Sequence, residues 1–276
     1  MKSRLLDIMD AQYLPKGDIT ESGRWFYTAT QSRNITIGCG AKVELLIFDS
    51  DRCEADCDEE CEATIDIRLE GGAELKLVHV ITHDGVTLLN IDLRGDAQCR
   101  VTEVMLGAST LKVTSSLMGS NAHFDLNGLF VLVGEQRGSV EVDVNHLHAE
   151  TTSRTLFKGV ASGVARGKFS GMILVEPDAQ RILAEQTSRN IVLNEAQILT
   201  EPQLEIYADD VKCSHGATVG QLDSDAILYM RQRGLSLEDA KRMQVEGFVS
   251  DVVMHAAIER LMEPLQGLLS EKFKQL

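Results

Sequence analysis

The stretch DAQCRV (Asp96–Val101) repeats a pattern that also occurs in GAELKL (Gly72–Leu77) and NAHFDL (Asn121–Leu126). In each, an alanine precedes a polar residue and then an apolar one, with another apolar residue one or two places on. The three alanines are 24 and 25 residues apart, a period typical of solenoids and other stacked arrays. Weaker copies are GAKVEL (Gly40–Leu45), DAQRIL (Asp178–Leu183) and EAQIL (Glu195–Leu199).

The segments between these copies predict strands. Apolar and polar residues alternate in them, as in SVEVDV (Ser139–Val144), and long helical patterns are absent from about residue 30 to residue 220. A small residue such as alanine suits a tight inner corner, and alternating apolar side chains can stack inside a solenoid. A β-sandwich would also give many short strands. The regular alanine pattern favours a mainly β chain built on a right-handed parallel β-helix.

Both ends of the chain depart from the strand pattern. One helix is expected around Leu5–Met9, followed by a loop. From about residue 224 the pattern becomes helical, and Ser236 and Asp239 stand at the spacing of a capping box. The sequence therefore predicts three parts: an N-terminal segment (1–30), the β-helix (31–222) and a C-terminal helical region (223–276).

Composition excludes several classes of partner. The formal charge is −15 and the pI is near 4.9, so we expect no binding to nucleic acid or anionic lipid. No apolar run reaches the ~18 residues that span a bilayer, and the first residues do not form a secretory signal, which predicts a cytoplasmic protein. The phosphate-binding pattern GxxxxGK[ST] is absent, so we expect any ATP chemistry to belong to a partner.

Cys213 and His215 form the strongest candidate site. Residues two apart on a strand project to one side, and cysteine and histidine are both metal ligands. Two ligands do not fill a coordination sphere. The small residues that follow, Gly216 and Ala217, would let another backbone approach closely.

The surrounding sequence resembles a known family. YADDVKCSHGATVG (Tyr207–Gly220) and the following QLDSDAILYMRQRGL (Gln221–Leu235) are similar to SufD-like members of the SufB/SufD family, scaffold proteins of the SUF iron–sulfur cluster assembly machinery. The resemblance is clear from about Asn121 to Leu235 and fades toward the N-terminus. Because the chain is shorter than typical members, we expect a short form of the family.

The resemblance implies a fold, partners and a site. It implies a parallel β-helix with C-terminal helices, a SufB-like partner at the end of the β-helix and a SufC-type ABC ATPase on the helices. It implies a non-catalytic scaffold, in which Cys213 and His215 lie at the subunit interface and take part in cluster assembly. The cluster, expected to be [4Fe-4S], would be held transiently there, with none bound to the isolated chain. The missing ligands would come from the partner.

Other cysteines and histidines are weaker candidates. Cys53, Cys57 and Cys61 could bind a metal, because three thiolates at intervals of four can share a helix face or wrap a metal from a loop. Eight acidic residues within 49–62 disfavour free thiolates there, so an exposed acidic loop is the alternative. His146 and His148 are expected to line one face of a strand, and Cys99 to lie in the core.

Two further functions are compatible with a β-helix. A second copy of the chain could replace the SufB-like partner and give a minimal, self-pairing scaffold. A polysaccharide-active enzyme is the other possibility, with surface carboxylates as acid and base. Such enzymes stack sugars on aromatic side chains, and the aromatic content of 5% argues against this interpretation.

Overall fold

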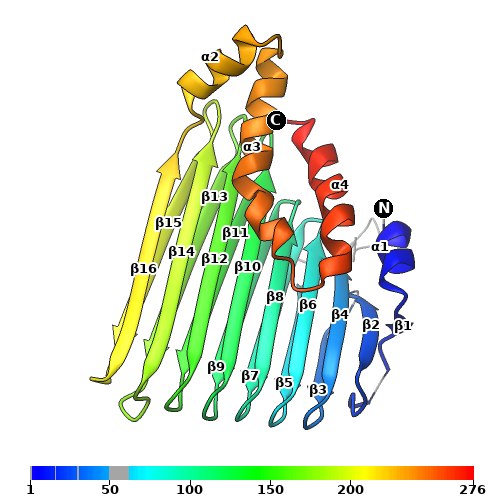
Figure 1. Cartoon of the computed structure of the whole chain (residues 1–276), viewed down its shortest axis with the longest axis vertical. Coiled ribbons are helices and arrows are strands. Elements are labelled where there is room, and N and C mark those ends of the chain that lie inside the picture. Colours follow the sequence, from blue (N-terminus) through cyan, green and yellow to red (C-terminus); the bar gives the residue numbers. More distant parts are fainter. Residues whose placement is uncertain (1, 16, 30, 50–61) are drawn as a thin grey trace.

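Two parallel sheets form the body of the molecule in a computed structural model that describes residues 2–15, 17–29, 31–49 and 62–276. Successive strands alternate between the sheets, so the chain winds into a β-solenoid of about six turns (Figure 1). The nine-stranded sheet has the order β1 (Gln12–Tyr13), β2 (Gly23–Thr28), β4 (Lys42–Asp49), β6 (Glu74–Ile81), β8 (Gln98–Met105), β10 (His123–Leu132), β12 (Thr152–Ala161), β14 (Ile182–Val192) and β16 (Val211–Gly220). The seven-stranded sheet has the order β3 (Arg33–Ile37), β5 (Glu62–Leu69), β7 (Gly85–Leu93), β9 (Ser109–Leu117), β11 (Arg137–His146), β13 (Arg166–Val175) and β15 (Gln197–Ile206). The predicted parallel β-helix is confirmed.

Four alanines of the repeat occupy one corner of the solenoid. Each follows a residue with positive φ, which turns the chain, and its N–H donates to the carbonyl three residues earlier. The four pairs are Gly40–Ala41, Gly72–Ala73, Asp96–Ala97 and Asn121–Ala122. Glycine, aspartate and asparagine tolerate this conformation, and the alanines are buried where a larger side chain would crowd the turn. The predicted role of alanine at an inner corner is confirmed at these positions.

The alternation of apolar and polar residues along each strand determines which side chains fill the interior. In β8, Cys99, Val101 and Met105 point between the sheets, and in β11 Val140, Val142 and Val144 do the same from the other side. Four phenylalanines are fully buried, and Phe157 lies 5.6 Å from Phe169 between ring centroids, across the two sheets. The apolar side chains of the interior fix strand register, because a slip of one residue would turn them outward.

Helices cover part of the outer face of the nine-stranded sheet. The covering helices are α1 (Lys2–Met9), α3 (Leu237–Met254), the 3-10 helix η1 (Glu259–Leu261) and α4 (Met262–Phe273), whereas α2 (Ser224–Gln232) buries no residue and packs on α3. Figure 1 shows α3 and α4 in front of the strands. Val78 and Val80 of β6 pack in one apolar cluster with Val249 of α3 and Leu265 of α4. The C-terminal halves of β4, β6 and β8 are therefore buried on both faces of the sheet.

Specific contacts hold the helices on the sheet. Ser236 caps α3 by accepting a hydrogen bond from the backbone N–H of Asp239, as the capping-box spacing predicts. The backbone N–H of Ala257 donates to the Thr102 hydroxyl of β8 at 2.8 Å. No helix in the described part of the chain is long and apolar enough to cross a membrane.

The N-terminal segment corrects one expectation. The helix around Leu5–Met9 is present in α1, but residues 12–13 and 23–28 form strands in the region predicted to be a loop. β2 has the sequence GRWFYT, whose aromatic residues favour extended backbone, and it pairs with β4. Its Tyr27 is buried in the interior, so the sheet begins before residue 31.

Candidate functional site

One end of the solenoid finishes in two terminal strands. β15 ends the order of the seven-stranded sheet and β16 that of the nine-stranded sheet (Figure 1). Among the described residues, neither has a strand on its outer side. Eight of the ten residues of β16 are exposed, in contrast to the buried strands behind it. A long exposed edge offers a row of backbone N–H and C=O groups to another chain.

Cys213 and His215 lie on β16 and face the inside of this end. Cys213 is in register with Ala184 of β14, and His215 with Gln186. The Cys213 side chain is half-buried against the apolar cluster of the last turns, whereas His215 is exposed. A side-chain carbon added at Gly216, on the opposite face of the strand, would touch nothing within 4 Å, so that face of β16 is open.

The Cys213 thiol is protonated more readily than a free cysteine. Burial raises its pKa, and a backbone hydrogen bond with Ala184 opposes that rise. Only the thiolate is a good metal ligand, so binding a cation here must release a proton. The pair offers one sulfur and one nitrogen ligand at an open edge, and a second chain can supply the remainder.

The other predicted candidates are placed differently. Cys53, Cys57 and Cys61 lie outside the described residues, and metal binding by them stays a prediction. Cys99 is buried in the interior, which confirms it as a core residue, and burial raises the pKa of its thiol strongly.

The pairing of His146 with His148 on one strand face is wrong. β11 ends at His146, whose ring nitrogens lie 2.7 Å from the Thr151 hydroxyl and 2.8 Å from that of Ser153. His148 lies in the following corner, where its Nδ1 is 3.2 Å from the Ser120 hydroxyl. The strand ends before His148 because the chain turns there, with Glu150 at a positive φ.

A buried charged cluster has no counterpart among the sequence predictions. His79 Nδ1 lies 2.9 Å from Glu103 Oε2, and His79 Nε2 lies 3.8 Å from Asp49 Oδ2, with all three side chains fully buried. His83 Nδ1 is 3.7 Å from Asp49 Oδ1. Burial alone lowers the pKa of His79, but the carboxylates of Glu103 and Asp49 outweigh it and raise this pKa to about 9.

In the sequence, this cluster is indicated by polar residues at strand positions where the alternation predicts an apolar one. His79 interrupts ELKLVHVI and Glu103 interrupts QCRVTEVM. They are one turn apart in sequence and adjacent in the ladder between β6 and β8. In the described parts of the chain, no three histidine, cysteine or acidic side chains are placed to hold a metal ion, so the cluster is a buried charge network.

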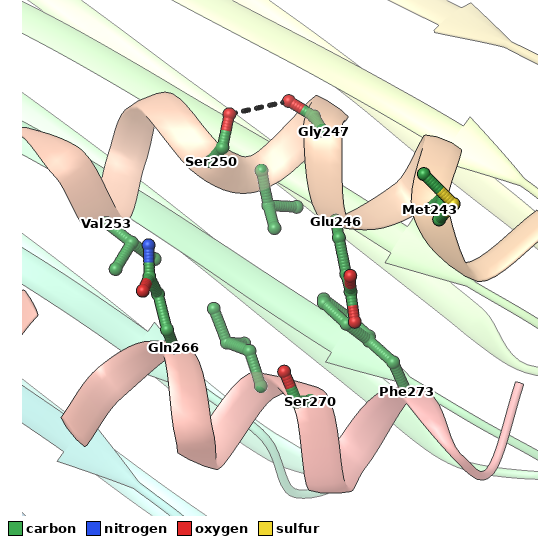
Figure 2. A pocket seen from close by; sticks show the side chains of 10 residues that line it. Met243, Glu246, Gly247, Ser250, Val253, Gln266, Ser270 and Phe273 are labelled. Atoms are coloured by element: carbon green, nitrogen blue, oxygen red, sulfur yellow. Dashed lines mark hydrogen bonds between the residues drawn. The ribbon is translucent and has the colours of Figure 1, made fainter. Parts of the chain in front are cut away.

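A groove of about 430 Å³ separates α3 from α4 (Figure 2). Val249 and Val253 of α3 and Leu269 and Phe273 of α4 supply its apolar floor. Glu246 and Gln266 stand at its rim, and Met243 is half exposed at one end. The groove is an open surface of mixed apolar and polar side chains on the helical region.

Comparison with known proteins identifies the family. The model of the SufBD core domain of SUF-system iron–sulfur cluster assembly matches residues 23–248. The iron–sulfur cluster assembly protein SufD of Escherichia coli is 32% identical over 202 residues, covering 72% of this chain and 47% of that protein. SufD of Bacillus subtilis is 32% identical over 162 residues, covering 58% and 37%. A SufBD family protein of Synechocystis is 35% identical over 178 residues, covering 62% and 38%.

The match extends over most of this chain and includes the strand that carries Cys213 and His215. The chain spans about half, or less, of the length of these relatives. The chain belongs to the SufBD core domain family of the SUF iron–sulfur cluster assembly system, as a SufD-like member.

Proposed function

We propose that this chain is a non-catalytic scaffold subunit in iron–sulfur cluster assembly. It works in the cytoplasm with a SufB-like chain and a SufC-type ABC ATPase. The observation that carries the proposal is the position of Cys213 and His215 on the terminal strand of the solenoid, beside an edge with no partner strand in the described chain. Its SufD relatives in Escherichia coli and Bacillus subtilis are iron–sulfur cluster assembly proteins, which supports the same role.

The SufB-like partner docks on the end formed by β15 and β16. Edge strands pair through their backbone, and β16 presents ten residues for this purpose. The small residues Gly216 and Ala217 allow close approach next to the two ligands. The partner supplies the missing ligands, so a [4Fe-4S] cluster is built transiently between the chains and leaves as cargo. The isolated chain has half a site and holds none.

The ATPase docks on the C-terminal helices. The helix α2 has no buried residue, and its Leu228 and Tyr229 are more than half exposed. The groove between α3 and α4, with its apolar floor and polar rim, adds a second surface on the same region. Because α3 packs on β10 and β12, movement of a bound ATPase would be transmitted to the sheet that carries Cys213.

Complementation tests the site. Cells that lack their own SufD-like scaffold would express Cys213→Ser, His215→Ala or the control Cys39→Ser, which alters an exposed cysteine elsewhere. We expect Cys213→Ser and His215→Ala to abolish assembly while the complex still forms, and Cys39→Ser to support growth. A packing role for Cys213 would instead cost only about 1 kcal/mol of stability. Full complementation by both single variants and by the double variant would refute the proposal.

Pairing with a second copy is the alternative to a SufB-like partner. The same edge strand would then meet its own copy about a twofold axis. Native mass spectrometry after co-expression with both partner types separates the two cases. A complex with one copy of this chain and one SufB-like chain supports the proposal, and a complex with two copies of this chain and no SufB-like chain supports self-pairing.

A further inference from the structure

The inner face of β14 changes from apolar to polar along the strand. Ile182 and Ala184 pack in an apolar cluster, but the next inward residues are Gln186, Ser188 and Asn190. Each of these three is at most 2% exposed. Polar side chains in a solenoid interior are destabilising unless they form hydrogen bonds, so each of the three is expected to have a hydrogen-bond partner.

Gln186 differs from its neighbour Asn190. The amide nitrogen of Asn190 donates to the Ser188 hydroxyl at 3.0 Å and to the Thr218 carbonyl at 3.1 Å, which ties β14 to β16. Neither the nitrogen nor the oxygen of the Gln186 amide has a hydrogen-bond partner among the described residues. A buried polar group left unpaired is destabilising, so this amide is expected to have a partner in the working complex.

The facing sheet leaves room for this side chain. A side-chain carbon added at Gly171 of β13 would lie 1.7 Å from the amide nitrogen of Gln186. The Gln186 side chain therefore crosses the interior and ends against the backbone of the other sheet. Glycine at position 171 is what permits the amide to lie there.

The residues of the terminal layer in register with Gln186 and Gly171 include one hydrogen-bonding side chain. His215 is in register with Gln186, and Pro202 of β15 is in register with Gly171. Proline has no side-chain donor or acceptor, whereas the imidazole has both. Adjacent strands are about 4.8 Å apart, so side chains in register on one face lie within reach of each other. In the uncovered chain, His215 is exposed to solvent and does not bond the amide.

We propose that Gln186 is a positioning residue for His215, an inference that rests on the proposed function. When a partner covers β16, the imidazole is confined against the layer beneath it. The amide oxygen of Gln186 then accepts a hydrogen bond from one ring N–H of His215. That bond fixes the tautomer and leaves the lone pair of the other ring nitrogen for iron at the interface.

Two substitutions test this in different ways. Gln186→Met keeps the length of the side chain and removes both hydrogen-bonding groups. Gly171→Ala keeps Gln186 but displaces its amide, the flexible end of the side chain. Gln98→Met, on the exposed face of β8 and away from the proposed docking end, is the matched control. The readouts are the His215 tautomer, from ¹⁵N-histidine NMR of the iron-free complex, and cluster assembly.

We expect a single His215 tautomer in the complex with the native chain and with Gln98→Met. Gln186→Met and Gly171→Ala should give a mixture and reduce assembly by roughly tenfold or more, the usual effect of losing a group that orients a metal ligand. Thermal melting shows which variants are folded. If Gln186→Met does not fold, Gly171→Ala serves as the test. An unchanged tautomer and unchanged assembly would overturn the inference. In that case the proposed function would still stand if Cys213→Ser and His215→Ala abolish assembly. If these two variants support full assembly, the proposed function is refuted as well.

Discussion

The ammonium group of Lys158 on β12 lies 2.7 Å from a carboxylate oxygen of Asp251 on α3. The same group donates to the Phe248 carbonyl at 2.5 Å and lies 4.6 Å from the centre of the Phe248 ring. Lys158 is 5% exposed, so it is a buried cation whose charge meets partners on a single helix. These contacts fasten the helical region to the sheet.

Removing the carboxylate should loosen this attachment. Asp251→Asn leaves the Lys158 charge buried without its counter-ion, and we expect a loss of roughly 1–3 kcal/mol in the free energy of unfolding. The control is Glu185→Gln, which removes a distant, exposed partner of Arg154 at 3.9 Å and should change stability by less than about 0.5 kcal/mol. Urea denaturation of the three proteins measures both values. Equal stability of Asp251→Asn and the native chain would show that the ion pair is dispensable.

Deleting α3 and α4 should damage the solenoid itself. Their removal uncovers a band of apolar side chains on the nine-stranded sheet. The band consists of Leu46, Phe48, Val78, Val80, Val104, Leu129, Val131 and Val160. Burying one such side chain contributes roughly 1.5–3 kcal/mol, so the truncated chain should be less stable and self-associate.

Size-exclusion chromatography and dye binding to apolar surface would measure this effect. A chain ending at residue 235 that elutes as a monomer with native stability would contradict the assigned packing. A deletion of residues 2–9 is a useful comparison, because Leu5 and Met9 are the buried residues of α1 in the same cluster among the side chains that the structure describes.

The buried cluster around His79 predicts a loss of stability in alkali. The pKa of His79 is raised to about 9 in the folded chain, against an ordinary value of 6.5. Between these values the folded state binds more protons than the unfolded state, so the free energy of unfolding falls as pH rises. The stabilisation that the His79 proton provides is fully present below pH 6.5 and is lost as the pH rises past 9. For one proton the slope approaches about 1.4 kcal/mol per pH unit.

Denaturation between pH 6 and 10 would reveal this slope, with His79→Gln as the comparison. We expect the variant to be less stable at pH 6 and to lose the His79 part of the alkaline slope. The same slope in both proteins would assign the effect to other groups.

His146 predicts the opposite dependence in acid. Burial lowers its pKa to about 4 in the folded chain. Below pH 6.5 the unfolded state takes up the proton first, so stability falls as pH decreases toward 4 and is fully present above 6.5. Thermal melting between pH 4 and 7 should therefore show a steeper decline for the native chain than for His146→Gln. The exposed His148 provides the control, and His148→Gln should follow the native curve.

The sequence alone was sufficient for the repeating architecture. Alternation of apolar residues determines which side chains face the interior, and the alanines mark corners where a larger residue does not fit. Both signals are local, because they depend on strand period and on backbone conformation over a few residues. The spacing of Cys213 and His215 likewise places both on one side of a strand.

Only the tertiary structure determined which residues each side chain contacts. His79 and Glu103 are 24 residues apart in sequence and touch because two turns stack. Val78 and Val80 point outward like any solvated residue of a strand, and they are buried because helices from the far end of the chain cover them. His215 and Gln186 have no sequence signal that links them, since 29 residues separate them. They become neighbours because β16 stacks on β14 at the end of the sheet where the described chain supplies no further strand, and that stacking depends on the whole solenoid.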